Sequence, residues 1–135
     1  MLKKIDHIGI AVVDLDQGLA LFRDVLGLTY LGTEIVEEMK VKVGILKIGE
    51  VRIELLEATS EDSPIARFLA DGGRGVHHLA FVADDVNRAL NACEAQGIRA
   101  VDKQVRPGAD GATVAFLHPK STQGVLIELT DGGDS

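Results

Sequence analysis

The chain has 135 residues, of which 14 are Lys or Arg and 21 are Asp or Glu, and its formal net charge is −7. An apolar fraction of 46% supports a hydrophobic core, and this length fits one compact domain. The acidic balance and the aromatic content of 4% disfavour nucleic acid as a partner, because phosphate binding needs a basic surface and base stacking needs aromatic platforms.

The sequence shows no membrane span, signal peptide or disulfide framework. The apolar stretch over residues 8–13 is far shorter than the ~18 residues of a membrane span, and Asp6 and Asp14 interrupt the run that a signal peptide needs. Cys93 is the single cysteine, which excludes an intramolecular disulfide and a cysteine-based zinc site. We therefore expect a soluble, cytoplasmic domain.

The first half of the chain predicts one strand, one helix and three further strands. Alternation over residues 5–12 indicates the strand, and either Asp14 or Asp16 suits the N-cap of the helix that follows. Apolar residues recur at helical spacing over 15–26, and Gly27 is a natural stop. The three further strands are expected near residues 29–37, 41–48 and 51–57.

A short helix and a glycine-rich linker are predicted next, after which the same order of elements returns. Pro64 suits the first turn of a helix over 65–69, and the linker is residues 72–75. The second half is expected to contain a strand at 76–82, a helix at about 85–96, and strands near 99–104, 112–117 and 124–130. The prediction is therefore a single α+β domain over residues 1–135, with two modules over about 1–58 and 75–131.

The two modules are related by an internal repeat. His78 follows His7 by 71 residues, and Glu128 follows Glu54 by 74 residues. The two intervals differ by three residues, which differences in loop length between the modules are enough to explain. Two copies are too few for a solenoid, so the repeat indicates a duplicated unit within one domain.

Strand alternation separates the two histidines and the two glutamates from the apolar rows. Gly9 and Ala11 share the strand face of His7, and Ala80 shares the face of His78, so small neighbours leave room for a ligand. Equivalent places in a duplicated unit converge if the halves pair symmetrically. We therefore predict one site that contains His7, Glu54, His78 and Glu128.

This donor set suits a divalent metal ion. Imidazole and carboxylate without thiolate favour Mn, Fe, Co, Ni or Zn, and four ligands on a six-coordinate ion leave two positions for water or a chelating substrate. A lone strand histidine is more often a hydrogen-bonded core or edge residue and a lone strand glutamate is usually solvated, so the coincidence across the repeat carries the prediction. The other candidates are interpreted as packed, loop or solvated residues: His77, Cys93, His118, Glu37, Glu38, Glu57 and Glu61.

Six stretches carry a resemblance to a known family. They are residues 5–11, 53–57, 62–66, 75–81, 116–120 and 124–129. Together they resemble the vicinal oxygen chelate superfamily, whose fold is built from tandem βαβββ modules around a metal. Within it the chain resembles the methylmalonyl-CoA epimerases along nearly its whole length. The Asp-Ser-Pro-Ile-Ala stretch and the Leu-His-Pro-Lys stretch are the more specific to the epimerases.

The resemblance implies a metal-dependent isomerase. The implied ligands are His7, His78 and Glu128, with Glu54 where some members carry Gln, and the implied ion is Co²⁺, with Mn²⁺, Ni²⁺, Zn²⁺ or Mg²⁺ as alternatives. The implied reaction interconverts (2R)- and (2S)-methylmalonyl-CoA through α-proton removal and a metal-stabilised enolate. Some members carry a catalytic Glu where we align Val43, so Glu128 is the first proton-transfer candidate and Glu54 the second.

An acyl-CoA thioester is anionic, so a chain of net charge −7 needs a local basic patch to bind it. Lys120 is the first candidate for a CoA contact, followed by Arg106 and Lys103. Family members are commonly dimers, so the resemblance also implies a homodimer. Neither nucleic acid nor a membrane is expected as a partner.

Three other functions belong to the same fold. A glyoxalase I-type lyase would act on a glutathione hemithioacetal through a similar four-ligand site. An Fe(II) ring-cleaving dioxygenase would need two histidines and one carboxylate, and Glu54 as a fourth ligand argues against it. A metal-free ligand-binding protein would not need the two histidines and two glutamates. The stretches specific to the epimerases favour the epimerase over all three.

Overall fold

The computed structural model describes residues 1–102 and 104–133, and the chain divides into two compact units. The first unit is His7–His77, and the second combines Met1–Asp6 with the chain from His78 onward. The division falls inside the first strand, which therefore contributes residues to both units. Among the described helices, none has the length and apolar character needed to cross a membrane.

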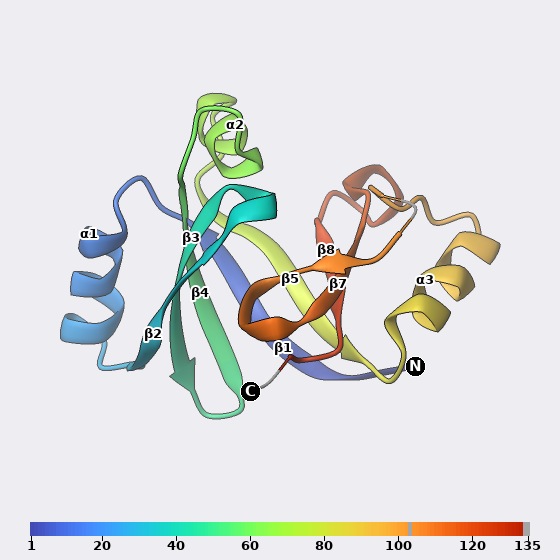
Figure 1. The fold of residues 1–135 in the computed structure, drawn as a ribbon, viewed down its shortest axis with the longest axis horizontal. Helices are drawn as coiled ribbons and strands as arrows, with labels where there is room; N and C mark the ends of the chain where they lie inside the picture. The colour runs from blue at the N-terminus through green and yellow to red at the C-terminus, as the bar shows by residue number, and fades with distance from the viewer. Residues whose placement is uncertain (103, 134–135) are drawn as a thin grey trace. The chain divides into compact units, whose positions relative to one another are not determined.

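In the first unit, four strands pair in the order β2-β3-β4-β1 (Figure 1). They are β1 (Leu2–Ala11, of which residues 7–11 belong to this unit), β2 (Thr29–Val36), β3 (Val41–Ile48) and β4 (Val51–Ala58). β2, β3 and β4 are antiparallel neighbours, whereas β4 and β1 are parallel. A 3₁₀ turn at Glu37–Met39 joins β2 to β3. The three strands predicted after the helix are confirmed to within one residue.

The helix predicted over 15–26 is confirmed, with two hydrogen-bonding patterns. It begins as α1 (Leu15–Leu19) and continues as a π-helix (Ala20–Val25). Asp14 is the N-cap, because its carboxylate accepts a hydrogen bond from a backbone N–H of the first turn. Gly27 follows the helix with φ of 80°, a conformation that favours glycine.

The interpretation of Glu57 as a solvated charge is wrong. Its Oε1 accepts a hydrogen bond from the backbone N–H of Leu15 at 2.8 Å. Alternation along β4 places Glu57 on the face of Ile53 and Leu55, which is the face that packs against α1. The carboxylate therefore satisfies an N–H at the start of α1 that has no acceptor within the helix.

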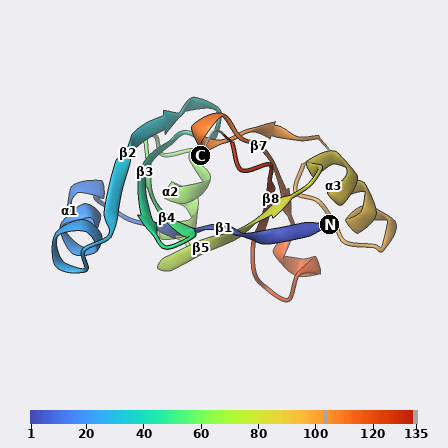
Figure 2. The ribbon, with the colours of Figure 1, turned by 90° about the horizontal axis from the view of Figure 1, so that it is seen from below.

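α1 packs against one face of β3 and β4. Both ribbon views show the helix at the β2 side of these strands (Figures 1 and 2). Leu15 and Leu19 of the helix form a buried cluster with Leu46 and Leu55 of the strands. Gly44 permits the close approach, because a Cβ at this position would lie 2.7 Å from Leu15 Cδ1. The predicted apolar row facing the helix is confirmed in this unit.

The short helix predicted over 65–69 is α2 (Pro64–Ala70). Ser63 is fully buried at its N-terminus, where the hydroxyl accepts a hydrogen bond from the Ile65 N–H at 3.2 Å. The ring of Phe68 meets the ring of His77 edge to face, with centroids 4.9 Å apart. Of the two interpretations open for His77, packed or exposed, the contact with Phe68 favours the first.

In the second unit, four strands pair in the order β5-β8-β7-β6. They are β5 (Gly75–Ala83, from His78 onward in this unit), β6 (Arg106–Pro107), β7 (Thr113–Leu117) and β8 (Ile127–Thr130). α3 (Val86–Ala95) packs its apolar face against β7 and β8, and 3₁₀ turns occur at Ala109–Gly111 and Pro119–Ser121. The core of this unit consists of Ala83, Val86, Ala89, Leu90, Ala115, Leu117 and Leu129.

The predicted strand near residues 99–104 is wrong for the part of it that the structure describes. Ala100 makes only an isolated bridge with Leu117, and the strand beside β7 is instead the two-residue β6. Pro107 has no N–H to donate, which limits the length of pairing at this position. β8 also begins later than predicted, because Gly124 has a φ of 91° and continues the preceding turn.

Candidate active site

His7 and Glu54 form a buried pair in the first unit. β1 and β4 run parallel in a register that places Gly9 opposite Glu54, so the carboxylate extends over a position without a side chain. His7 Nδ1 lies 3.4 Å from Glu54 Oε2, and each side chain is 5% exposed. The sequence analysis predicted that these two residues share one face of the sheet, and within this unit they meet.

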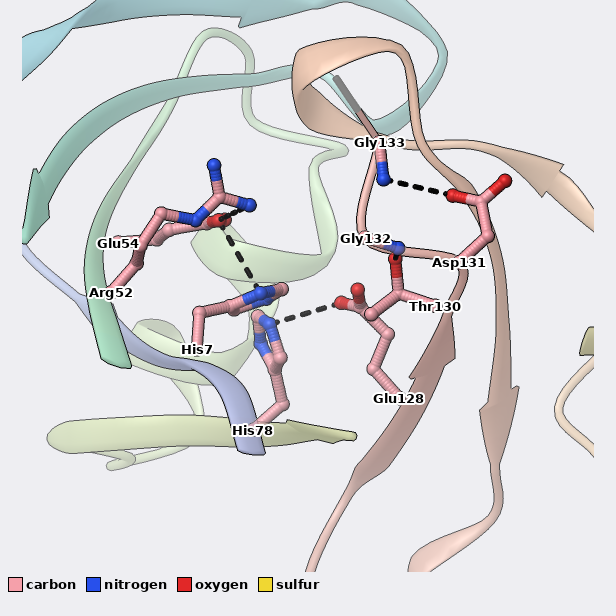
Figure 3. Close-up of polar contacts among 9 residues, drawn as sticks. All are labelled: His7, Arg52, Glu54, His78, Glu128, Thr130, Asp131, Gly132 and Gly133. Atoms are coloured by element: carbon pink, nitrogen blue, oxygen red, sulfur yellow. Dashed lines mark hydrogen bonds and ion pairs between the residues drawn. The ribbon is translucent and has the colours of Figure 1, made fainter. Parts of the chain in front are cut away.

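Arg52 is a third member of this cluster, and the sequence analysis missed it. It lies opposite His7 in the β1–β4 register, and its Nη2 is 3.7 Å from Glu54 Oε2, the same oxygen that faces His7 (Figure 3). Its side chain is 8% exposed. Arg52 stands two residues before Glu54, so strand alternation alone places both on one face.

His78 and Glu128 form the corresponding pair in the second unit. β5 and β8 are parallel, with Ala80 opposite Glu128, which repeats the small residue opposite Glu54. His78 Nε2 lies 3.1 Å from Glu128 Oε1, and the two side chains are 6% and 7% exposed. The edge of the His78 ring contacts Phe116 of β7, with centroids 5.9 Å apart, which fixes the plane of the imidazole.

The end of β8 is held by hydrogen bonds just beyond Glu128. Thr130, on the same face of the strand, is buried, and its Oγ1 accepts from the Gly132 N–H at 3.1 Å. The Asp131 carboxylate accepts from the Gly133 N–H at 2.9 Å (Figure 3). It also accepts from the Thr113 N–H at 3.1 Å. These contacts fix the strand that carries Glu128.

The spacing within each pair fits two neighbouring ligands of one metal ion. Ligand bonds of about 2.1 Å at right angles separate the two ligand atoms by roughly 3.0 Å. The observed N···O distances of 3.1 and 3.4 Å are near this value. Each unit therefore presents one buried imidazole and one buried carboxylate, a donor set that suits a divalent ion.

Two of the three predicted CoA-binding residues are described, and both belong to the second unit. Lys120 is exposed on the 3₁₀ turn, and its backbone N–H donates to His118 Nδ1 at 3.1 Å. Arg106 forms an ion pair with Asp102. Lys103 lies outside the described residues.

Two further residues of the sequence analysis are packed in the interior or at its margin. Val43 is 1% exposed on β3, directly opposite Leu56 of β4, and so lies on the face that carries Glu54. Cys93 packs against the core of the second unit, and burial raises the pKa of its thiol.

Comparison with known proteins gives the family. Residues 6–116 match the Glyoxalase/Bleomycin resistance protein/Dioxygenase superfamily. The mitochondrial methylmalonyl-CoA epimerase of Homo sapiens is 36% identical over 129 residues, which cover 95% of this chain and 73% of the relative. An ethylmalonyl-CoA/methylmalonyl-CoA epimerase of Cereibacter sphaeroides is 34% identical, over 96% of this chain and 98% of the relative.

A solved structure is similar in fold along the same length. It is a methylmalonyl-CoA epimerase in complex with methylmalonyl-CoA and NH4+, with a TM-score of 0.92 and 40% identity over 96% of this chain and 94% of its own. The α+β fold with βαβββ modules that the sequence predicts is thereby confirmed. The chain belongs to the glyoxalase/bleomycin resistance protein/dioxygenase superfamily and, within it, to the methylmalonyl-CoA epimerase family.

Proposed function

We propose that this protein interconverts the (2R) and (2S) epimers of methylmalonyl-CoA with the help of a divalent metal ion. The observation that carries the proposal is the pair of buried His–Glu contacts, at equivalent positions of the repeat, in a member of this enzyme family. The substrate class comes from relatives, one of which was solved with methylmalonyl-CoA. We assign His7, Glu54, His78 and Glu128 as the ligands of one ion.

The donor set favours a borderline ion, and Co²⁺ is our first choice before Mn²⁺, Ni²⁺, Zn²⁺ or Mg²⁺. When bound, the ion supplies positive charge beside the thioester oxygen, where negative charge develops as the α proton leaves. The chain's own residues then have to remove that proton from one face of C2 and return a proton to the other face. Epimerisation requires both transfers.

Glu128 is our first proton-transfer residue, with Glu54 as the second. Both carboxylates are buried beside an imidazole, so water is largely excluded from them. A carboxylate that came within reach of the α carbon of a bound substrate would meet the geometric requirement for a general base. The buried Val43 cannot act in this way.

Glu34 is a further carboxylate for the second transfer. It lies on β2 directly opposite Val43, which in turn lies opposite Leu56. Residues directly opposite one another in antiparallel strands share a face, so Glu34 lies on the face that carries Glu54. Its side chain is partly buried. Glu34 and Glu54 are the two carboxylates that the register places on this face of the described strands.

Lys120 is proposed to contact the CoA moiety, because it is an exposed cation in a chain of net charge −7. The protein is proposed to be a cytoplasmic homodimer.

A deuterium wash-in tests the proposal. Metal-stripped protein would be loaded with Co²⁺ and incubated with (2S)-methylmalonyl-CoA in D₂O, with mass spectrometry for label at C2 and a coupled mutase assay for the (2R) epimer. We expect label and epimer with Co²⁺, and a large loss of both with Glu128→Gln. A parent protein that binds Co²⁺ and neither exchanges nor epimerises would overturn the substrate assignment, and a glutathione hemithioacetal would be tested next.

A further inference from the structure

The buried Arg52 is the one cation that contacts the proposed ligand set among the described ion pairs of the first unit. Its guanidinium and the His7 imidazole both face Oε2 of Glu54, at 3.7 and 3.4 Å. All three side chains are at most 8% exposed, so solvent screens their charges little. A cation so placed competes with a metal ion for the same carboxylate oxygen.

The repeat does not reproduce this cation. Glu128 is the counterpart of Glu54, and Leu126 stands two residues before it, where the first unit has Arg52. The backbone pairing is the same in both units, with Gly9 opposite Glu54 and Ala80 opposite Glu128. Arg52 therefore places a positive charge beside the Glu54 carboxylate, whereas Leu126 at the corresponding position places none beside Glu128.

We propose that Arg52 is a positioning residue that acts through Glu54, fixing the orientation of its carboxylate and offsetting its charge. The Arg52 guanidinium offsets one negative charge beside the proposed ligand Glu54. With this charge offset, a bound metal ion would retain more positive charge to stabilise a substrate oxygen that becomes negative as a proton leaves. This last step rests on the proposed function, whereas the effect on metal binding does not.

The test is a cycle of four proteins: the parent, Arg52→Gln, Glu54→Gln, and the variant with both changes. Each would be stripped of metal and titrated with Co²⁺, followed by visible absorption, and then assayed for kcat and KM with methylmalonyl-CoA. Arg52→Lys keeps the charge and changes only its shape. Lys47→Gln is the matched control, because Lys47 is an exposed cation directly opposite Arg52 on β3.

We expect Arg52→Gln to tighten Co²⁺ binding at least tenfold and to lower kcat at least tenfold, with KM changed less than threefold. Without the guanidinium, Co²⁺ no longer competes for the Glu54 carboxylate and is no longer repelled by a neighbouring cation, and both changes strengthen Co²⁺ binding. The Glu54 charge that is no longer offset disfavours the negative charge that develops on the substrate, and this lowers kcat. In the Glu54→Gln background the same change should alter each quantity less than threefold. Arg52→Lys and Lys47→Gln should stay within threefold of the parent in Co²⁺ affinity.

Equal effects of Arg52→Gln in both backgrounds would overturn the proposal. So would a variant that is only less stable to urea, with unchanged Co²⁺ affinity and absorption, since that is the signature of an ion pair with a purely structural role. If Arg52→Gln does not fold, the role of Arg52 is decided by Arg52→Lys and by the double variant. The double variant leaves no unpaired charge at this position. A parent that binds Co²⁺ without epimerase activity refutes the proposed function alone, and a parent that binds no Co²⁺ refutes the role of Arg52.

Discussion

Removal of the Glu57 carboxylate is expected to weaken the attachment of α1 to the sheet. Glu57 lies on β4, and its Oε1 accepts from the N–H of Leu15, the first residue of α1, 42 positions earlier in the chain. That N–H has no acceptor within the helix. In Glu57→Ala this partly buried N–H loses its side-chain acceptor.

The magnitude follows from the kind of bond that is lost. Loss of a side-chain cap costs about 0.5–2 kcal/mol, and a hydrogen bond to a charged acceptor is worth about 1.5–3 kcal/mol. The Leu15 N–H is partly buried, and Asp14 still caps the same turn, so we expect a loss of about 1–2 kcal/mol in the free energy of unfolding. For 135 residues, this corresponds to a fall in Tm of roughly 3–10 °C.

Urea unfolding followed by circular dichroism would measure the change, with the slope m unchanged if only stability is affected. Glu57→Gln keeps an acceptor and should lose about half as much. Glu61→Ala is the matched control, since Glu61 is an exposed glutamate shortly after β4. If Glu57→Ala lies within about 0.3 kcal/mol of this control, the hydrogen bond contributes nothing measurable and the reasoning is refuted.

Three further outcomes test the proposed chemistry. Glu34→Gln is expected to lower epimerisation at least tenfold while one epimer still exchanges its α proton with D₂O; equal loss of exchange from both epimers would contradict a role in one transfer only. Lys120→Ala is expected to raise KM for the CoA thioester at low salt with little change in kcat, and an unchanged KM would remove Lys120 from the binding site. Removal of metal with EDTA should lower Tm, by an amount equivalent to about 2.7 kcal/mol relative to Co²⁺ at 100 times its Kd, and an unchanged Tm would argue against a site among His7, Glu54, His78 and Glu128.

Period-two alternation accounts for most of what the sequence predicts correctly. It places His7 with Glu54 and His78 with Glu128 on faces opposite the apolar rows, and each pair is in contact within its unit. The rule is reliable here because one face of each strand is fixed by a helix with its own periodic apolar residues. Whether the two pairs hold one ion stays a prediction.

The same rule places Arg52 on the face of Glu54, and Glu57 on the face that packs against α1. Each was missed because a charged residue on a strand is usually solvated, and alternation gives only the face of a residue and not its burial. The π-helical turn at 20–25 and the missing strand at 99–102 are of another kind. The π-helical turn and the absent strand depend on which backbone N–H and C=O groups pair with one another. The periodicity of apolar residues does not predict this pairing.

The strand β1 changes unit between Asp6 and His7, and this has a consequence for the order of folding. The first unit is one continuous segment and can close as soon as His77 has been synthesised. The second unit needs residues made at the very beginning, since the Asp84 N–H donates to the Met1 carbonyl and Lys3 pairs with Asp84. Closing that loop of about 80 residues carries an entropic cost that grows with its length. We therefore expect the first unit to fold earlier, and the second to form around a strand that is already anchored at one end.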